Sequence, residues 1–415
     1  FLTVEILAVL VSVYSFIQLA GFDAFGIQQP GLDRPVSTFG NAVFFGGFLT
    51  LIFPFSILNI SSKKNNILKI IFPAIIVTGI VFSGTRSAYI ALAAETALLI
   101  GLYLFIKKKN GAAGAEKINE GRYIKNILYL TGGVVLVFLL YILIAPESFL
   151  SRRILSFFSS SNNPRLVLWQ DSFNLFLKYP VFGTGIAMFS SAFEEFYSNR
   201  LRFLERTGYF DNPHNNFLYM LYSMGLIGML AYISILVQAL RRCLVNIFKG
   251  TDSDKKIIFM AFTAFIAGYS VYGLTNFDDI SILLYFFVFL GALKAADSEK
   301  SKELIFKRKL ILMIAIPVIL VCSYNIYSSI NDMKADRFFK LGNQLIKQGK
   351  FAEAVYNMNT AIAMNDYYTD YKYALANTVY RQVFSSETMP KETKMNLLNQ
   401  SARQVEGLRD SHYFI

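Results

Sequence analysis

Apolar residues along this chain gather in long runs, in place of the short alternating or helical stripes of a water-soluble fold. Nine runs reach or approach the roughly 17–25 mostly apolar residues that a helix needs to cross a bilayer. They cover residues 2–20, 43–60, 67–83, 87–106, 124–145, 216–240, 257–276, 280–295 and 309–329. The pattern therefore predicts an all-α, polytopic helical membrane protein.

The composition leads to the same fold class. Of the 415 residues, 54% are hydrophobic and only 16% are charged, whereas about a quarter of the residues of a soluble domain are charged. The 40 Phe and 24 Tyr are more side chains than an ordinary core can bury, so much of their apolar surface must face lipid. The chain begins at Phe1 inside an apolar run with no basic segment before it, so we expect it to be a fragment with further spans upstream.

Basic residues separate the connections between these runs into two alternating sets. One set is rich in Lys and Arg and falls near residues 63–64, 107–125, 241–256 and 294–309. By the positive-inside rule this set is cytoplasmic. The other set is then extracytoplasmic, and it comprises 21–42, 84–86, 146–215, 277–279 and everything after 330. The net charge of +12 is thus mostly an orientation signal, and we expect no nucleic-acid partner.

Two segments outside the membrane have patterns of their own. The extracytoplasmic loop 146–215 predicts an amphipathic helix from Arg165 to Lys178, ended by Tyr179-Pro180, and a second helical run over roughly 187–205. Gly183 and Gly185 allow a tight turn between these helices. We expect both helices to lie on the membrane surface, although a structural cap without chemistry is the open alternative.

The C-terminal segment, residues 331–415, has apolar and small residues at the spacing of one tetratricopeptide repeat. They are Phe338, Leu341, Gly342, Leu345, Ala354, Met358 and Ala361. The sequence thus predicts a transmembrane catalytic domain, 1–330, followed by an extracytoplasmic domain, 331–415, that resembles such repeats. A groove for a protein partner and a plain helical cap remain equally open interpretations of this tail.

His214 is the clearest candidate for acid–base chemistry. It lies in Asn212-Pro213-His214-Asn215-Asn216, where the long outer loop meets the sixth span. An imidazole there can take a proton from a hydroxyl group and return it. A structural role at the start of the helix is the alternative.

Arg86 and Arg165 are candidates for phosphate binding on the same side of the membrane. A guanidinium group donates two parallel hydrogen bonds to phosphate oxygens, and the helix that Arg165 opens attracts anions at its N-terminus. Ion pairs with Asp171, Glu194 or lipid phosphate are the alternative. Only Cys243 and Cys322 are present and no CxxC pair occurs, so we expect neither a disulfide framework nor a metal site.

These landmarks together resemble the O-antigen ligase and O-antigen polymerase superfamily. His214-Asn215 is followed nine residues later by Gly225-Leu-Ile-Gly228, which is similar to the signature of that family. Three further segments between residues 35 and 295 resemble the family in the same order. They are Ser37-Thr-Phe-Gly-Asn41, Ser83-Gly-Thr-Arg86-Ser, and Arg165 through Trp169 to Pro180-Val-Phe-Gly183-Thr-Gly185.

The resemblance implies a GT-C-type fold in a bacterial inner membrane and glycosyl transfer that needs no metal or cofactor. The donor would be a glycan linked to undecaprenyl pyrophosphate, and the acceptor a hydroxyl group of a glycan, lipid or protein. Arg86 and Arg165 would bind the pyrophosphate, His214 would be catalytic, and Asn215, Gly183 and Gly185 would support the site. The resemblance does not separate a ligase from a polymerase.

Two other functions are compatible with a membrane protein of this kind. A carrier for polysaccharide or lipid-linked glycan predicts inverted repeats and polar residues at mid-depth, and no convincing repeat is present. A scaffold that recruits a protein partner through its tail is the second. Neither gives a reason for Arg86, Arg165 and His214, so we favour the enzyme.

Overall fold

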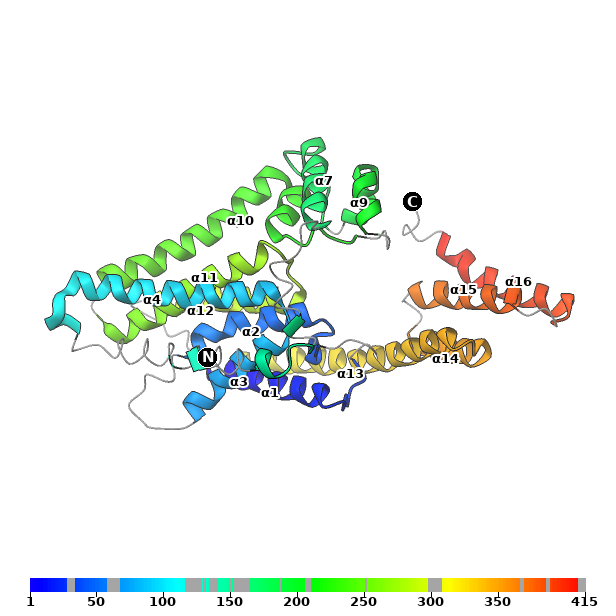
Figure 1. Ribbon diagram of the computed structural model, residues 1–415, viewed down its shortest axis with the longest axis horizontal. Coiled ribbons are helices and arrows are strands. Elements are labelled where there is room, and N and C mark those ends of the chain that lie inside the picture. Colours follow the sequence, from blue (N-terminus) through cyan, green and yellow to red (C-terminus); the bar gives the residue numbers. More distant parts are fainter. Residues whose placement is uncertain are drawn as a thin grey trace. The chain divides into compact units, whose positions relative to one another are not determined.

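A computed structural model shows the chain as an array of helices (Figure 1). It describes residues 1–27, 34–57, 68–115, 129, 132–133, 141–148, 151–152, 164–186, 188–205, 210–250, 252–297, 308–365, 369–385 and 389–409. In these ranges the regular elements are helical. The chain forms two compact units, one of Phe1–Asp23 with Gln28–Ser301 and one of Ala24–Ile27 with Lys302–Ile415.

The first unit contains most of the predicted spans. Its long helices are α1 (Leu2–Leu19), α2 (Ala42–Ser56), α3 (Leu68–Phe82), α4 (Arg86–Ala115), α10 (Asn216–Lys249), α11 (Ser253–Gly273) and α12 (Ile280–Asp297). Among the described residues, five stretches are long and apolar enough to cross a membrane: Leu2–Leu19, Arg86–Ile106, Asn216–Lys249, Lys255–Gly273 and Ile280–Asp297. The apolar helices Ala42–Ser56 and Ile70–Phe82 are shorter. The chain is a multi-pass helical membrane protein.

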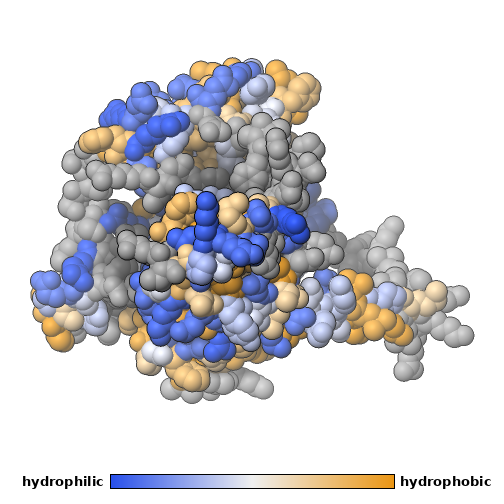
Figure 2. Space-filling view, turned by 90° about the vertical axis from the view of Figure 1, so that its right-hand side faces the viewer, coloured by the Kyte–Doolittle hydropathy of each residue, from blue (hydrophilic) through white to orange (hydrophobic). Residues whose placement is uncertain are grey.

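Large apolar side chains stay exposed on these helices, as expected for surfaces that face lipid. Leu10, Ile227 and Leu284 are each more than half exposed. Figure 2 shows hydrophobic side chains at the surface in patches among hydrophilic ones.

Two predicted spans need separate comment. Most of span 124–145 lies outside the described residues. Span 309–329 lies within α13 (Arg308–Lys347), which continues without a break into the predicted tail. The two units divide between Ser301 and Lys302 rather than after residue 330, and the functional assignment of the two predicted domains stays a prediction.

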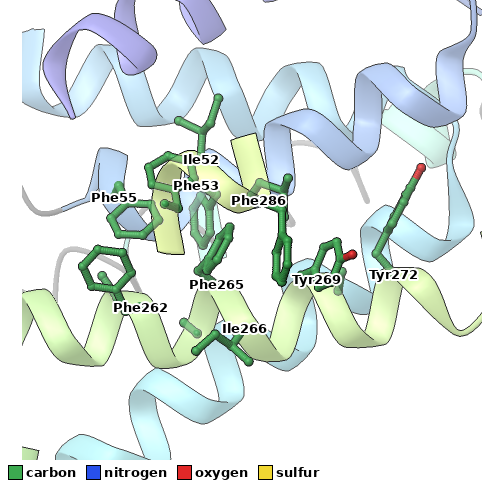
Figure 3. Close-up of a cluster of buried hydrophobic side chains, with 14 of the residues drawn as sticks. Ile52, Phe53, Phe55, Phe262, Phe265, Ile266, Tyr269, Tyr272 and Phe286 are labelled. Carbon is green, nitrogen blue, oxygen red and sulfur yellow. The ribbon is translucent and has the colours of Figure 1, made fainter. Parts of the chain in front are cut away.

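The core of the first unit is built around α11. This helix packs against α2, α4 and α10. In its most apolar stretch of 18 residues 72% is buried inside the protein, against 22–33% in the corresponding stretches of the other four spans. Figure 3 shows Phe262, Phe265 and Tyr269 of α11 directed towards aromatic side chains of α2 and α12. The Tyr269 and Phe286 rings stack with centroids 4.1 Å apart. Because α11 is held on several sides, the loop that follows it is held in place at its start.

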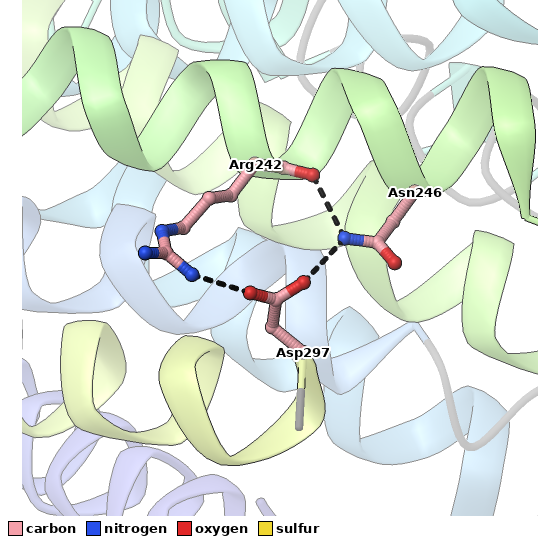
Figure 4. A network of polar contacts seen from close by, with 3 residues as sticks. All are labelled: Arg242, Asn246 and Asp297. Carbon is pink, nitrogen blue, oxygen red and sulfur yellow. Dashed lines mark hydrogen bonds and ion pairs between the residues drawn. The ribbon is translucent and has the colours of Figure 1, made fainter. Parts of the chain in front are cut away.

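A polar cluster joins α10 to α12 at the end that the charge pattern predicts to be cytoplasmic (Figure 4). Asp297 accepts hydrogen bonds from Arg242 Nη1 at 2.5 Å and from Asn246 Nδ2 at 2.7 Å. These bonds fix the ends of the two helices relative to each other.

The outer loop confirms one predicted helix and contradicts the other. α7 (Pro164–Lys178) ends before Tyr179-Pro180, as expected. The second predicted helix, 187–205, is wrong as a single element, because it divides into α8 (Phe189–Phe193), η4 (Glu194–Phe196) and α9 (Asn199–Leu204). Ser198 causes the break, since its extended backbone caps α9 and its hydroxyl accepts from Leu201 N.

The second unit continues from α13 into α14 (Phe351–Met364), α15 (Thr369–Ser385) and α16 (Lys391–Arg409). Each helix packs on the next. Gly349 takes a left-handed backbone (φ 76°) in the turn before α14, and Ala354, Met358 and Ala361 are buried as the repeat spacing predicts. The classification of this unit as a tetratricopeptide-like domain stays a prediction.

Candidate active site

His214 lies directly before α10, in an unusual backbone conformation. Its φ is 50°, the left-handed region that non-glycine residues rarely adopt. Asn212 Oδ1 accepts a hydrogen bond from the His214 backbone N–H at 2.9 Å, and Asn215 caps α10 by accepting from Leu218 N at 3.1 Å. Asparagines on both sides therefore fix the backbone of His214. The expected position at the start of a helix is confirmed, and Asn215 is the N-cap of that helix.

Arg165 is the second residue of α7. Its Nη1 donates to the carbonyl oxygen of Thr275 at 3.1 Å. One turn further along, Trp169 Nε1 donates to the carbonyl oxygen of Pro213 at 3.0 Å. The outer-loop helix is thus bonded both to the segment that carries His214 and to the connection between α11 and α12.

Arg86 is the first residue of α4, after a turn in which Gly84 has a φ of 63°. The neighbouring Thr85 hydroxyl donates to the Ala42 carbonyl at 2.9 Å, and Ser87 Oγ accepts from Asn276 Nδ2. The turn that carries Arg86 is therefore bonded to the start of α2 and to the connection between α11 and α12, which Arg165 also contacts.

That connection, residues 274–279, is the element on which the three candidate segments meet. Thr275 binds Arg165, and Asn276 binds the residue next to Arg86. The Phe277 ring lies against the His214 ring, with centroids 5.6 Å apart, and against Phe44 of α2 at 5.3 Å. The structure thus brings the segments of all three residues to one short loop, although Arg86 and His214 lie 128 positions apart in the sequence.

Asp278 anchors this loop to the membrane helices. Its Oδ2 accepts from Asn216 Nδ2 at 2.8 Å and from the Tyr269 hydroxyl. Asn216 Nδ2 also lies 3.1 Å from the Tyr232 hydroxyl. Because Asn216 follows His214 by two residues, this network ties the position of the loop to that of the imidazole.

Burial and charge set the protonation of two titratable groups near this loop, His214 and Asp278. Burial lowers the pKa of His214, the positive charge of Arg165 lowers it further, and Asp211 acts in the opposite direction. Burial raises the pKa of Asp278 to about 6, against the opposing effect of hydrogen bonds from Tyr269 and Asn216. At neutral pH the imidazole is therefore the neutral form that accepts a proton.

Gly183 and Gly185 lie where the outer loop packs against a break in α10. Gly225 interrupts that helix with φ 65° and ψ −166°. Backbone hydrogen bonds cross the break, from Thr184 N to Tyr222 O at 2.8 Å, from Gly185 N to Ser223 O at 2.9 Å, and from Leu226 N to Pro180 O at 2.8 Å.

Side chains would not fit at this contact. A Cβ on Gly225 would lie 2.2 Å from Val181 O, and one on Gly183 would lie 2.5 Å from Ser223 O. The segment with Gly183 and Gly185 and the segment with Gly225 therefore meet in one backbone-to-backbone contact. The hydrogen bonds of this contact satisfy the backbone N–H and C=O groups that have no helical partner at the break in α10.

A comparison with known protein families matches residues 71–233 to the family described as O-antigen ligase. The chain carries an O-antigen ligase domain. The match runs from α3 into α10, so it includes Arg86, Arg165, the paired glycines and His214. This confirms the resemblance to the O-antigen ligase and polymerase superfamily. A search of curated proteins found no match to the chain.

The loop 274–279 lies outside the segment matched to the O-antigen ligase family. The sequence analysis assigned only 277–279 to a connection and placed residues 274–276 in the span 257–276, whereas α11 ends at Gly273. The contacts of Asn276, Phe277 and Asp278 were therefore missed. The adjacent acids Asp278 and Asp279 were the available signal, since acids so near a membrane span are unusual. Among the described residues, no three His, Cys, Asp or Glu side chains lie together as a group that could hold a metal ion.

Proposed function

We propose that the chain transfers a glycan from undecaprenyl pyrophosphate to an acceptor hydroxyl group on the extracytoplasmic side of a bacterial inner membrane. Support comes from the O-antigen ligase domain over residues 71–233 and from the loop 274–279, which bonds the segments of Arg86, Arg165 and His214. The second of these observations carries the proposal, because it links the segments of three residues that are distant in sequence.

In this reaction His214 removes the proton from the acceptor hydroxyl group as its oxygen attacks the anomeric carbon of the donor. The bond between that carbon and the pyrophosphate oxygen breaks, and undecaprenyl pyrophosphate leaves with the electron pair. The lowered pKa of His214 keeps the imidazole neutral and ready for this step.

Arg86 and Arg165 bind the pyrophosphate and stabilise the negative charge that grows on it. Fixed cations achieve this without a metal ion, so metal independence is part of the proposal. Arg165 also has a bond to the Thr275 carbonyl, which orients its guanidinium group. A Lys at either position keeps the charge but loses the planar pair of donors.

The site faces the extracytoplasmic side in this proposal, because the loops that carry the three residues alternate with the Lys- and Arg-rich connections that the positive-inside rule assigns to the cytoplasm. The hydroxyl group attacked belongs to a lipid, a protein or another glycan. Transfer to the first two is ligation, and transfer to the third is polymerisation. The tail after residue 330 is a candidate for presenting the acceptor.

The test is transfer by the purified full-length chain in detergent, with a fluorescent glycan on undecaprenyl pyrophosphate and separate lipid, protein and glycan acceptors. The proposal predicts a labelled acceptor and released undecaprenyl pyrophosphate, unchanged in amount by a chelator. A single added unit identifies a ligase, and a ladder identifies a polymerase. No product with any acceptor counts against transfer, and loss of product with the chelator counts against metal independence.

A further inference from the structure

A polar cavity lies between α10 and α12, at the end of these helices that the charge pattern predicts to be cytoplasmic. Its volume is about 290 Å³. It is lined by Asp297 of α12 and by residues at helical spacing on α10, which are Gln238, Arg241, Arg242, Val245 and Asn246. The cavity belongs to the first unit and contains none of the residues assigned to glycan transfer, so its function is separate from that reaction.

The one carboxylate among the described residues of the lining is already bonded by its neighbours. Asp297 accepts hydrogen bonds from Arg242 Nη1 and Asn246 Nδ2 (Figure 4). Arg242 has five N–H donors, and its side chain is still 46% exposed. Arg241 has no ion pair within the part of the chain that the structure describes. The cavity therefore offers a ligand a net positive charge and guanidinium donors.

The length of α10 places these arginines at the depth of lipid headgroups. The helix begins at Asn216, at the extracytoplasmic end in the predicted orientation, and Arg241 follows 25 positions later. At 1.5 Å per residue this is about 37 Å along the helix. The hydrocarbon core of a bilayer is about 30 Å thick, and the headgroups add roughly 5–7 Å on each side. A modest tilt of α10 keeps both guanidinium groups in the cytoplasmic headgroup layer.

An exposed apolar stripe leads from the membrane interior to the cavity. Leu230, Val237 and Arg241 follow one another at spacings of seven and four, so they lie on one face of α10. Leu230 and Val237 are each more than half exposed. A hydrocarbon chain that lies along this face ends at Arg241. A phospholipid would use both the stripe and the cations, whereas a free phosphate ion would use only the cations.

We propose that this cavity binds the headgroup of an anionic phospholipid of the cytoplasmic leaflet. The phosphate diester accepts hydrogen bonds from Arg241 and Arg242, whose planar forks suit two phosphate oxygens at once. The exposed amide of Gln238 donates to and accepts from headgroup hydroxyl groups, such as those of phosphatidylglycerol. Because the lining comes from both α10 and α12, the bound lipid holds the ends of the two helices together.

Charge distinguishes this lipid from a zwitterionic one. The headgroup of phosphatidylethanolamine carries an ammonium group, which the two arginines repel. Lys294, one turn before Asp297 on α12, adds a third cation. The carboxylate of Asp297 does not compensate for them, since Arg242 and Asn246 already donate to it.

Native mass spectrometry of the purified full-length chain measures how tightly each lipid is bound. Phosphatidylglycerol and phosphatidylethanolamine with identical acyl chains are added in detergent, and inorganic phosphate is added separately as a competitor. The cavity variant is Arg241→Gln, which leaves both bonds of Asp297 in place. The control is Lys255→Gln, which removes one exposed positive charge at the start of α11, outside the lining of the cavity.

The wild-type chain is expected to bind phosphatidylglycerol at least about fivefold more tightly than phosphatidylethanolamine. Arg241→Gln should weaken this binding at least about fivefold, because charge-assisted hydrogen bonds to the phosphate are lost, while Lys255→Gln stays within about twofold. Arg241→Lys keeps the charge without the fork and should fall between these two. Inorganic phosphate should not displace the lipid.

Thermal unfolding in detergent shows whether each variant folds. If Arg241→Gln does not, Arg241→Lys is compared with Lys255→Gln, and it should still bind phosphatidylglycerol more weakly. Absence of phosphatidylglycerol binding, equal binding of the two lipids, equal weakening in the control, unchanged binding in the Arg241 variant, or displacement by inorganic phosphate would overturn the proposal.

Discussion

His214 has a backbone conformation that costs a non-glycine residue about 1–3 kcal/mol. The structure offsets this cost with a hydrogen bond from its N–H to Asn212 and with the helix cap provided by Asn215. Such local strain is common where a side chain must be held in one place. The imidazole is therefore positioned by its own short segment as well as by its packing on Phe277.

The pH dependence of transfer tests the electrostatic contact between His214 and Arg165. Burial and the charge of Arg165 both lower the pKa of His214, so the rate should begin to fall only at a pH below the ordinary histidine value of about 6.5. Arg165→Gln removes the positive charge and should move this acid limb to higher pH, although the rate itself is lower. The measurement is kcat/KM from pH 5 to 8. An acid limb that stays in place in Arg165→Gln, or one that moves equally in Arg202→Gln, contradicts the contact.

Asp278→Asn tests the anchor of the loop through its pH-dependent stability. The folded chain raises the pKa of Asp278 from 3.8 to about 6, so it holds this proton more tightly than the unfolded chain does. The stability that this gives is complete below pH 4 and is lost as the pH rises through 6. Asn carries no charge there and can still accept from Asn216 and Tyr269.

The stability of Asp278→Asn relative to the wild type should therefore increase between pH 4.5 and 7.5, by roughly 1–3 kcal/mol. Thermal unfolding in detergent at several pH values measures this difference. A difference that stays constant with pH, or that decreases, would show that the carboxyl is not held as described.

The break in α10 joins two segments that the sequence shows only as separate glycine motifs. Its backbone bonds to residues 180–185 place the outer loop against the same helix that His214 precedes. The interruption of the helix lets residues 180–185 bond to it, which fixes the position of the loop segment that follows α7.

Gly225→Ala should destabilise the protein by about 2 kcal/mol or more, because the new Cβ meets Val181 O at 2.2 Å and the residue keeps a φ of 65°. Transfer should fall with it. Gly101→Ala is the matched control, since Gly101 lies in α4 with no atom within 4 Å of an added Cβ. It should change stability by less than about 1 kcal/mol. Equal unfolding temperatures for the two variants would contradict the close backbone approach.

The sequence predicts elements better than it predicts their contacts. Long apolar runs locate both ends of α1, α11 and α12 and the starts of α4 and α10 within a few residues, because burial in lipid needs a minimum helix length. The helices α4 and α10 continue past the predicted ends at 106 and 240, to Ala115 and Lys249. The second outer-loop helix was mispredicted, since Ser198 acts as a cap inside an otherwise helical pattern. The loop 274–279 has no motif of its own, and its importance arises from tertiary contacts that no periodicity encodes.

The orientation of the whole chain rests on the distribution of Lys and Arg between alternating loops. With Cys243 and Cys322 replaced by Ser, two single-cysteine variants test it: Arg202→Cys in α9 and Lys249→Cys at the end of α10. A membrane-impermeant maleimide should label Arg202→Cys in cells whose inner membrane is intact, and Lys249→Cys only after that membrane is opened. Labelling in the reverse pattern contradicts the predicted sidedness and with it the extracytoplasmic site.

The first unit is a bundle of helices around α11, and the loop 274–279 after α11 contacts three segments that are distant in the sequence. In the proposed reaction, the segments of Arg86, Arg165 and His214 are already joined through loop 274–279 before any substrate arrives, so little reorganisation is needed.

The most direct measurement is the initial rate of glycan transfer by the purified variants Arg86→Lys, Arg165→Lys and His214→Asn. Asn tolerates the left-handed backbone at position 214, so this variant removes the imidazole without new strain. Each of the three should lose at least about 100-fold in rate, while Arg202→Lys, an exposed arginine of α9, stays within about twofold of the wild type. Wild-type turnover in any one of the three would contradict a single site formed by all of them.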